Sequence, residues 1–265
     1  MARRGDGRGM EIWKAAVFGA VQGLTEFLPV SSSGHLILLG RLLGAGGGMF
    51  FDVMLHGGTL IAVVLAYAPR LARLWKSGRK TLLYLLWGTV PAALAGAFLG
   101  DFVDEVFFGG EFLWAAFLLT ALLLLLAELR LRQNRPPRPL GARSSFAVGA
   151  AQALALVPGL SRSGATLSAG VFAGLSREDA ADFSFLLSIP IIAGAMFVQL
   201  VHAPVAAEAV SWQTLAVGGL CALAFGFASV RLMLRAVRRA ALWPFAAYLF
   251  ALSAVLVCLR FAAPV

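Results

Sequence analysis

The side chains best suited to chemistry gather in two short polar segments that interrupt long apolar stretches. The first segment offers an amide, a carboxylate, three hydroxyls and an imidazole, on Gln22, Glu26, Ser31, Ser32, Ser33, Gly34 and His35. The second offers a guanidinium between hydroxyls, on Ser161, Arg162, Ser163, Gly164 and Thr166. A hydroxyl can attack phosphorus, a carboxylate or imidazole can take its proton, and a guanidinium can hold phosphate oxygens. The two segments together therefore predict phosphate chemistry.

The two segments are copies of one pattern. Gln22 and Gln152 lie 152 − 22 = 130 positions apart, and Gly34 and Gly164 are separated by the same 164 − 34 = 130 positions. A duplicated Ser-x-Ser-Gly turn, with Glu and His in one copy and Arg in the other, predicts one site assembled from two halves.

Glu26 and Arg162 most need a function, because each lies in a strongly apolar stretch. An ionisable group inside a membrane is costly and marks a functional site by default. Gln22 lies four residues before Glu26 on the same helical face, so a hydrogen bond that only fixes packing is the alternative for Glu26. For Arg162 the alternative is a structural ion pair with a carboxylate such as Glu26. We expect Arg162 to hold phosphate through its planar fork of donors.

Ser31, Ser32 and Ser33 open a predicted helix just after a proline. Free backbone N–H groups and the helix dipole at such a start favour an anion. Ordinary N-capping could explain one serine but not three followed by a histidine. His35 follows Ser32 by three residues, and we expect it to act as base or acid toward that hydroxyl.

The composition fixes the environment in which these residues work. The chain has 265 residues, of which 60% are hydrophobic and 13% charged, and its mean hydropathy is +0.85. Soluble domains carry about 25% charged residues, so the sequence predicts an integral membrane protein. The net charge of +9 lies in short loops between apolar runs. It is therefore expected to orient the protein in the bilayer rather than to bind nucleic acid.

We predict an all-α polytopic membrane protein, with six transmembrane helices and two re-entrant helical hairpins in an inverted-topology repeat. The spans are expected at 51–68, 81–100, 112–130, 183–202, 212–232 and 243–262. The hairpins are expected at 11–43 and 144–175, where Pro, Gly and Ser break a helical pattern. The repeats cover about 11–130 and 144–262 of a single membrane domain, joined by a basic linker at 131–143.

Loop charge predicts the orientation. Basic residues concentrate in the segments 69–80, 130–143 and 231–239, which the positive-inside rule places in the cytoplasm. The segments 101–111 and 203–211 are acidic or neutral and are expected outside. The first hairpin would then enter from outside and the second from the cytoplasm. Three arginines near the N-terminus, Arg3, Arg4 and Arg8, would lie outside and argue the other way.

The two polar segments resemble the signature motifs of a known family. Gly23 to His35 reads Gly-Leu-Thr-Glu-Phe-Leu-Pro-Val-Ser-Ser-Ser-Gly-His, and Pro158 to Thr166 reads Pro-Gly-Leu-Ser-Arg-Ser-Gly-Ala-Thr. Both resemble motifs of the bacterial undecaprenyl-diphosphate phosphatases, a family linked to bacitracin resistance. The resemblance covers essentially the whole chain.

The resemblance implies a hydrolase acting on a phosphoric anhydride. Such an enzyme converts undecaprenyl diphosphate to undecaprenyl phosphate and inorganic phosphate, which recycles the lipid carrier for peptidoglycan and cell-wall synthesis. It also implies a bacterial inner-membrane location, a site open to the periplasm or outside, and dependence on Mg²⁺ or Ca²⁺. We also consider a homodimer.

The resemblance implies catalytic roles for Ser32, Glu26, His35 and Arg162, with Ser32 the favoured nucleophile. The other polar positions are expected to bind substrate: Gln22, Ser31, Ser33, Gly34, Ser161, Ser163, Gly164 and Thr166. The family's first motif begins with Glu or Gln followed four residues on by Glu. Because that first residue is Gln22 here, only Glu26 can offer a charged ligand to a metal.

Two questions stay open from the sequence alone. Ser32 can attack phosphorus itself, or water can attack while Ser32 donates a hydrogen bond, and either Glu26 or His35 can take the proton. Inverted repeats around a midplane site also build many carriers, so a polyprenyl-phosphate transporter or flippase using the same site is the alternative function. The sequence favours the enzyme, because Ser, His, Glu and Arg together exceed what anion binding needs.

Overall fold

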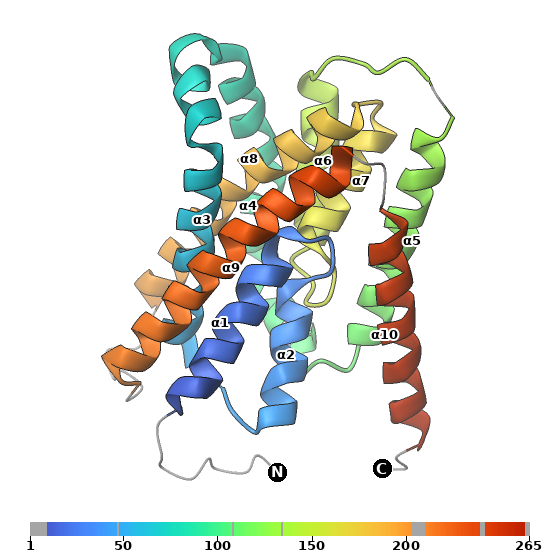
Figure 1. Cartoon of the computed structure of the whole chain (residues 1–265). Coiled ribbons are helices and arrows are strands. Elements are labelled where there is room, and N and C mark those ends of the chain that lie inside the picture. Colours follow the sequence, from blue (N-terminus) through green and yellow to red (C-terminus); the bar gives the residue numbers. More distant parts are fainter. Residues whose placement is uncertain are drawn as a thin grey trace.

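The computed structural model describes residues 10–46, 48–107, 109–133, 135–202, 210–238 and 242–262. Within these ranges the secondary structure is entirely helical. The helices are α1 (Ile12–Phe27), α2 (Ser32–Leu43), α3 (Gly48–Ser77), α4 (Arg79–Phe107), α5 (Leu113–Leu131), α6 (Ala142–Leu154), α7 (Arg162–Phe172), α8 (Arg177–His202), α9 (Trp212–Arg238) and α10 (Trp243–Ala262). The predicted all-α class is confirmed (Figure 1).

Six of these helices are long and apolar enough to cross a membrane, which confirms the six predicted spans. They are Gly48–Lys76, Arg79–Val103, Leu113–Leu131, Arg177–Val201, Trp212–Val237 and Trp243–Ala262. The chain is therefore a multi-pass membrane protein.

Several helices extend further than their predicted spans. Most of the segment 69–80, expected as a loop, belongs to α3 and α4, with Pro69 inside α3 and only Gly78 between the two helices. The residues Arg231 to Arg238 form the last two turns of α9. Hydropathy marks the end of an apolar core, but a helix can continue into water, where a proline costs little because solvent reaches the freed carbonyl.

The basic residues still gather at one end of the bundle. The ends of α3, α5 and α9 and the starts of α4, α6 and α10 meet there, at the top of Figure 1. We call this the basic end. Arg3, Arg4 and Arg8, Arg239 and most of the segment 203–211 lie outside the described residues.

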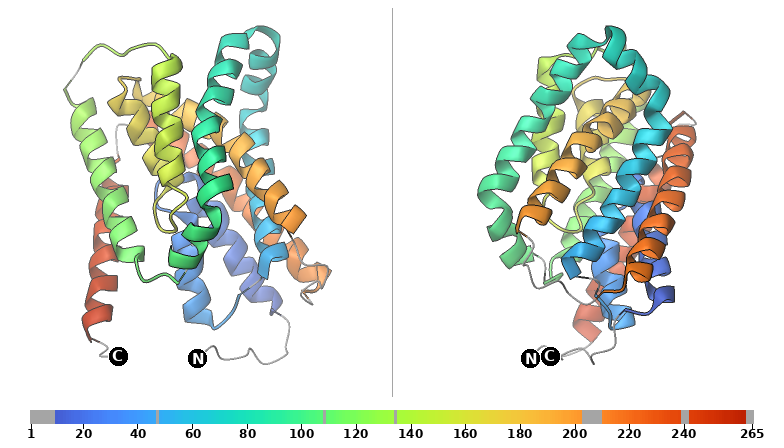
Figure 2. Two further views of the ribbon diagram at one scale, coloured as in Figure 1. Left: turned by 180° about the vertical axis from the view of Figure 1, so that it is seen from behind. Right: turned by 90° about the vertical axis from the view of Figure 1, so that its left-hand side faces the viewer.

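Two short helical hairpins turn back inside the bundle. The pair α1 and α2 starts at the end opposite the basic end, and the pair α6 and α7 starts at the basic end (Figures 1 and 2). Their tips, at 28–31 and 155–161, meet about halfway along the bundle. The two hairpins occupy the predicted positions and are consistent with re-entrant segments. The inverted repeat itself stays a prediction.

Each hairpin packs on a long helix from the other half of the chain. A Cβ atom added to Gly19 of α1 would lie 2.2 Å from the carbonyl oxygen of Gly218 in α9. A Cβ atom added to Gly149 of α6 would lie 2.2 Å from the carbonyl oxygen of Gly88 in α4. Because 149 − 19 and 218 − 88 both equal 130, the two contacts obey the same offset as the motifs. These close approaches hold both tips in the interior.

Candidate active site

The carboxylate of Glu26 is the centre of the site. Its Oε2 atom accepts hydrogen bonds from Gln22 Nε2 at 3.1 Å and from Ser32 Oγ at 2.6 Å. Its Oε1 atom accepts a hydrogen bond from Arg162 Nη2 at 2.6 Å, which is also an ion pair. Glu26 is 9% exposed, so the charge is buried and needs these donors. The structure thus joins four predicted site residues from both hairpins.

Ser31 holds the start of α2 in a strained conformation. It is the only non-glycine residue with a positive φ, +70°, in the part of the chain that the structure describes. Its side chain caps α2 by accepting from the Gly34 N–H. A conformation of this kind costs about 1–3 kcal/mol and is concentrated at functional sites. The equivalent residue Ser161 caps α7 through Gly164 in the same way but has φ −69°.

The two hairpin tips bond directly to each other. Ser163 Oγ donates to the carbonyl oxygen of Leu28 at 3.0 Å, and the Gly159 N–H donates to Ser33 Oγ at 3.4 Å. Gly34 allows this approach, because a Cβ there would lie 3.1 Å from the Cα of Gly159. The first helical residues of α2 and α7 both bond to Glu26, so two helix N-termini open onto one site and favour an anion there.

His35 lies beside the site, and its two ring nitrogens bond to groups other than Ser32. Its Nδ1 atom donates to the carbonyl oxygen of Ser31 at 2.6 Å, and its Nε2 atom lies 2.7 Å from the hydroxyl of Tyr248 in α10. The Tyr248 ring stacks on the imidazole with ring centroids 5.8 Å apart. No hydrogen bond therefore supports the expected proton transfer between His35 and Ser32, whereas the Ser32 hydroxyl donates directly to Glu26.

Thr166 turns away from the site. Its hydroxyl lies 2.8 Å from the carbonyl oxygen of Arg162, one turn earlier in α7, and 2.5 Å from Ser184 Oγ in α8. These contacts brace α7 against α8, and the residue is fully buried. The geometry gives the predicted substrate-binding role of Thr166 no support, because its hydroxyl is already used within the protein.

Two residues that frame the site were not foreseen. Thr120 of α5 accepts the Ser161 N–H at 3.0 Å and so fixes the second tip. Tyr248 positions His35. Both lie inside apolar spans, where a threonine normally bonds its own helix and a tyrosine near a span end normally belongs to the interfacial belt. Their types alone gave no signal that distinguished them.

Gln22 offers an oxygen that the protein leaves unused. Its Oε1 atom is buried and has no hydrogen-bond partner, while its Nε2 atom bonds to Glu26. No group of three or more His, Cys, Asp or Glu side chains that could hold a metal occurs among the described residues. Mg²⁺ needs only one or two carboxylates when substrate phosphates complete its shell. Glu26 and the Gln22 amide oxygen therefore fit such an ion.

An almost wholly apolar cavity of about 480 Å³ adjoins the second tip. Its walls come from α5, α6, the 155–161 turn and α7, and include Ala116, Leu119, Leu154, Leu160 and Ala165. Leu160 and Ala165 flank the segment that carries Ser161 and Arg162. The polar site and an apolar recess are thus neighbours in the sequence and in space.

Fold and site together define a polytopic helical membrane protein with a buried cluster of charged and hydroxyl side chains where two hairpin tips meet. The sequence matches the family described as "Bacitracin resistance protein BacA" over residues 15–255, and the chain belongs to that family. This confirms the resemblance seen in the two motifs.

Curated relatives cover nearly the whole chain. A protein of Rubrobacter xylanophilus is 43% identical over 270 residues, covering 94% of this chain and 98% of its own. One of Marinobacter nauticus is 37% identical over 260 residues, covering 93% and 98%. One of the archaeon Korarchaeum cryptofilum is 39% identical over 256 residues, covering 90% and 95%. All three are named undecaprenyl-diphosphatase.

Proposed function

We propose that this protein hydrolyses undecaprenyl diphosphate to undecaprenyl phosphate and inorganic phosphate. The observation that carries the proposal is the buried carboxylate of Glu26, bonded at once to the Ser32 hydroxyl and the Arg162 guanidinium at two helix N-termini. The names of the relatives support hydrolysis over the transport alternative. Recycling of the lipid carrier for cell-wall synthesis follows from that reaction.

The diphosphate of the substrate lies between the two hairpin tips. Arg162 uses one guanidinium nitrogen for Glu26, so its other N–H groups remain to bind phosphate oxygens. The first-turn backbone N–H groups of α2 and α7 complete the anion site. The N–H groups of Gly34, Ser161 and Gly164 already bond within the protein and hold the two turns in shape. The apolar cavity beside Leu160 takes the first isoprene units of the tail.

The reaction runs in two steps. Ser32 Oγ forms a bond to the terminal phosphorus while the bond from that phosphorus to the bridging oxygen breaks, and undecaprenyl phosphate leaves. Glu26 takes the serine proton, because it is already the acceptor of that hydroxyl at 2.6 Å. Water then attacks the phosphoserine, Glu26 returns its proton to Ser32 Oγ as the bond from phosphorus to that oxygen breaks, and inorganic phosphate leaves with both protons of the water. Arg162 stabilises charge on the phosphoryl oxygens in both steps.

A divalent cation, Mg²⁺ or Ca²⁺, would be held by Glu26, the free Gln22 oxygen and substrate phosphates. When bound, it would neutralise charge that develops on the leaving phosphate. His35, fixed by Tyr248, faces the same turn and orients the Ser31 carbonyl.

The protein works in the bacterial inner membrane with the basic end in the cytoplasm and the first hairpin entering from outside. In this orientation the substrate reaches the tips from the periplasmic or outer face. A homodimer stays an expectation of the family resemblance.

The test is phosphate release from undecaprenyl diphosphate by the purified protein in detergent with Mg²⁺. We expect rapid release by the parent, near-total loss in Arg162→Ala and Ser32→Ala, and near-parental release in Ser253→Ala. Ser253 is a matched control, because it is a buried serine that donates to a backbone carbonyl, that of Trp114, away from the tips. If the parent released no phosphate with Mg²⁺ or with Ca²⁺, the proposal would be refuted. Full turnover by Ser32→Ala would refute the covalent step alone.

A further inference from the structure

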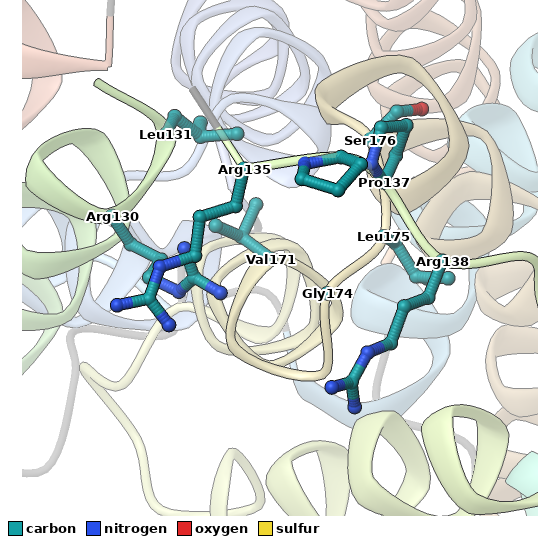
Figure 3. Close-up of a pocket in the computed structure, with 10 residues that line it drawn as sticks. Arg130, Leu131, Arg135, Pro137, Arg138, Val171, Gly174, Leu175 and Ser176 are labelled. Carbon is teal, nitrogen blue, oxygen red and sulfur yellow. The ribbon is translucent and has the colours of Figure 1, made fainter. Parts of the chain in front are cut away.

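A second cavity, polar and of about 540 Å³, lies at the basic end, at the opposite end of α7 from Arg162. The end of α5 and the linker after it form one wall, and the end of α7 with the turn before α8 forms the other (Figure 3). Its lining residues are Arg130, Leu131, Arg135, Pro136, Pro137, Arg138, Val171, Gly174, Leu175 and Ser176. Three of them are arginines and none is acidic.

The arginines of this cavity lack the carboxylates that their neighbours have. Arg132 and Arg177, just outside it, both pair with the buried Glu128, at 3.5 and 3.2 Å. Within the described part of the chain, no ion pair involves Arg135 or Arg138. Arg130 bonds only to the neutral side chain of Gln133. Like charges that share one cavity repel each other unless an anion lies between them.

The backbone that carries these arginines is held in place. Pro136 and Pro137 restrict the linker, because each proline fixes its own φ. The Arg138 N–H donates to the carbonyl oxygen of Gly174 at 2.8 Å, which ties the linker to the end of α7. Gly174 has φ +94°, and a Cβ there would lie 3.1 Å from Cδ of Arg138. A cavity whose walls are fixed beforehand binds a ligand at lower entropic cost.

We propose that this cavity binds a phosphate-bearing anion. A guanidinium matches phosphate oxygens in pairs, so three of them without acidic partners suit one phosphate group better than a carboxylate or a neutral ligand. Leu131, Val171 and Leu175 give the same cavity an apolar wall, which suits the glycerol and first methylenes of an acidic phospholipid. Basic pockets at the cytoplasmic ends of membrane helices bind such headgroups. The phosphate comes either from that lipid or from a free soluble anion.

The test measures binding to the purified full-length protein, with and without the substitutions Arg135→Ala and Arg138→Ala. The probes are dioleoyl phosphatidylglycerol in mixed micelles, dioleoyl phosphatidylcholine in the same micelles, and inorganic phosphate without added lipid. Arg143→Ala is the matched control, because it removes the same charge from an exposed position in the first turn of α6, just after the linker and outside the cavity. Phosphatase turnover in phosphatidylcholine micelles reports whether each variant is folded.

A guanidinium that binds the phosphate through charge-assisted hydrogen bonds contributes about tenfold or more to affinity, so the double variant should bind the phosphate-bearing probe about 100-fold more weakly. Arg143→Ala removes only the general attraction of the basic end and should weaken binding by at most about fivefold. If the double variant loses affinity for phosphatidylglycerol alone, the ligand is a lipid headgroup. If it loses affinity for inorganic phosphate as well, the ligand is a soluble anion. Either result supports the site. Equal losses in Arg143→Ala and in the cavity variants would reduce the effect to general surface charge and overturn the proposal. Unchanged binding in the double variant would overturn it too. If the alanine variant fails to fold, Arg135→Gln with Arg138→Gln takes its place with the same expectations.

Discussion

Replacing Glu26 with Gln tests the assignment of the proton acceptor. The amide has the same shape and can still accept the Ser32 hydrogen bond, which is 2.6 Å long. It cannot take the proton that Ser32 must lose when it attacks phosphorus. General-base catalysis contributes about 10²- to 10⁴-fold, which corresponds to about 2.7–5.4 kcal/mol of activation free energy. We expect kcat for phosphate release to fall by that factor at saturating Mg²⁺, a condition that offsets the weaker hold of an amide on the proposed ion.

The same substitution also acts on Arg162. It leaves the guanidinium without its charged partner, and removing one member of a buried ion pair destabilises a protein by about 3–5 kcal/mol. The polar surroundings and the 14% exposure of the Arg162 side chain reduce that cost here. The freed guanidinium is available to the substrate, so KM should stay level or fall while kcat collapses.

Glu128→Gln separates loss of chemistry from loss of stability. Glu128 is a second buried carboxylate that pairs with arginines, and it accepts the Leu242 N–H at the basic end. The change should lower the thermal midpoint as much as Glu26→Gln does, but it should leave kcat within about threefold of the parent. If Glu26→Gln retained kcat within about tenfold, or if Glu128→Gln lost as much kcat, Glu26 would not be the base.

Three further perturbations test the rest of the site. Gly34→Ala places a Cβ 2.5 Å from the Phe117 ring and should lower the free energy of unfolding by about 1–3 kcal/mol, measured by thermal unfolding. The control Gly96→Ala, which has open space around it, should change that free energy by less than about 1 kcal/mol. Equal effects of the two substitutions would contradict the close packing of the tips. Tyr248→Phe removes the hydroxyl that fixes the His35 imidazole and should reduce kcat about 2- to 12-fold at constant KM. An unchanged kcat would show that this contact has no part in the reaction. Gln22→Glu adds a charge to the candidate metal site and should lower the Mg²⁺ concentration for half-maximal activity about tenfold, while an unchanged Mg²⁺ requirement would place the ion elsewhere.

The fold followed from the sequence wherever one strong physical force decided the outcome. Apolar runs of about 20 residues must cross a bilayer, and irregular backbone within it must be buried in protein, so the six spans and the two broken hairpins were predictable. The ends of helices were not predictable in this way. Pro69 marks the end of an apolar core, but α3 continues past it for two more turns. Beyond the core, water and long basic side chains decide where a helix stops.

The composition of the site was predictable, but its pairings were not. An acidic and a basic residue in apolar segments, one in each copy of the motif, made an ion pair between Glu26 and Arg162 the alternative considered for Arg162, and the two do pair. The position of His35 could not be derived in the same way. Spacing along a helix placed it near Ser32, but its ring turns to Tyr248, which is 213 residues away in the sequence. A choice between a local and a distant partner depends on tertiary packing, which periodicity does not contain.

The differences between the two copies explain how a repeated turn can become a catalytic site. Two identical Ser-x-Ser-Gly turns would give two facing helix N-termini, which suffice to bind an anion but not to cleave it. Cleavage also needs a proton acceptor for the attacking hydroxyl and a fixed positive charge beside the phosphoryl oxygens. The copies differ at those positions, with Glu26 matched by Leu156 and Ser32 matched by Arg162 at the same offset of 130 residues. The strained φ of Ser31 is also confined to one copy, the copy that carries the hydroxyl and its acceptor. Under the proposed function, the site is therefore symmetric at the two helix N-termini that bind the phosphate and asymmetric at the residues that transfer the proton.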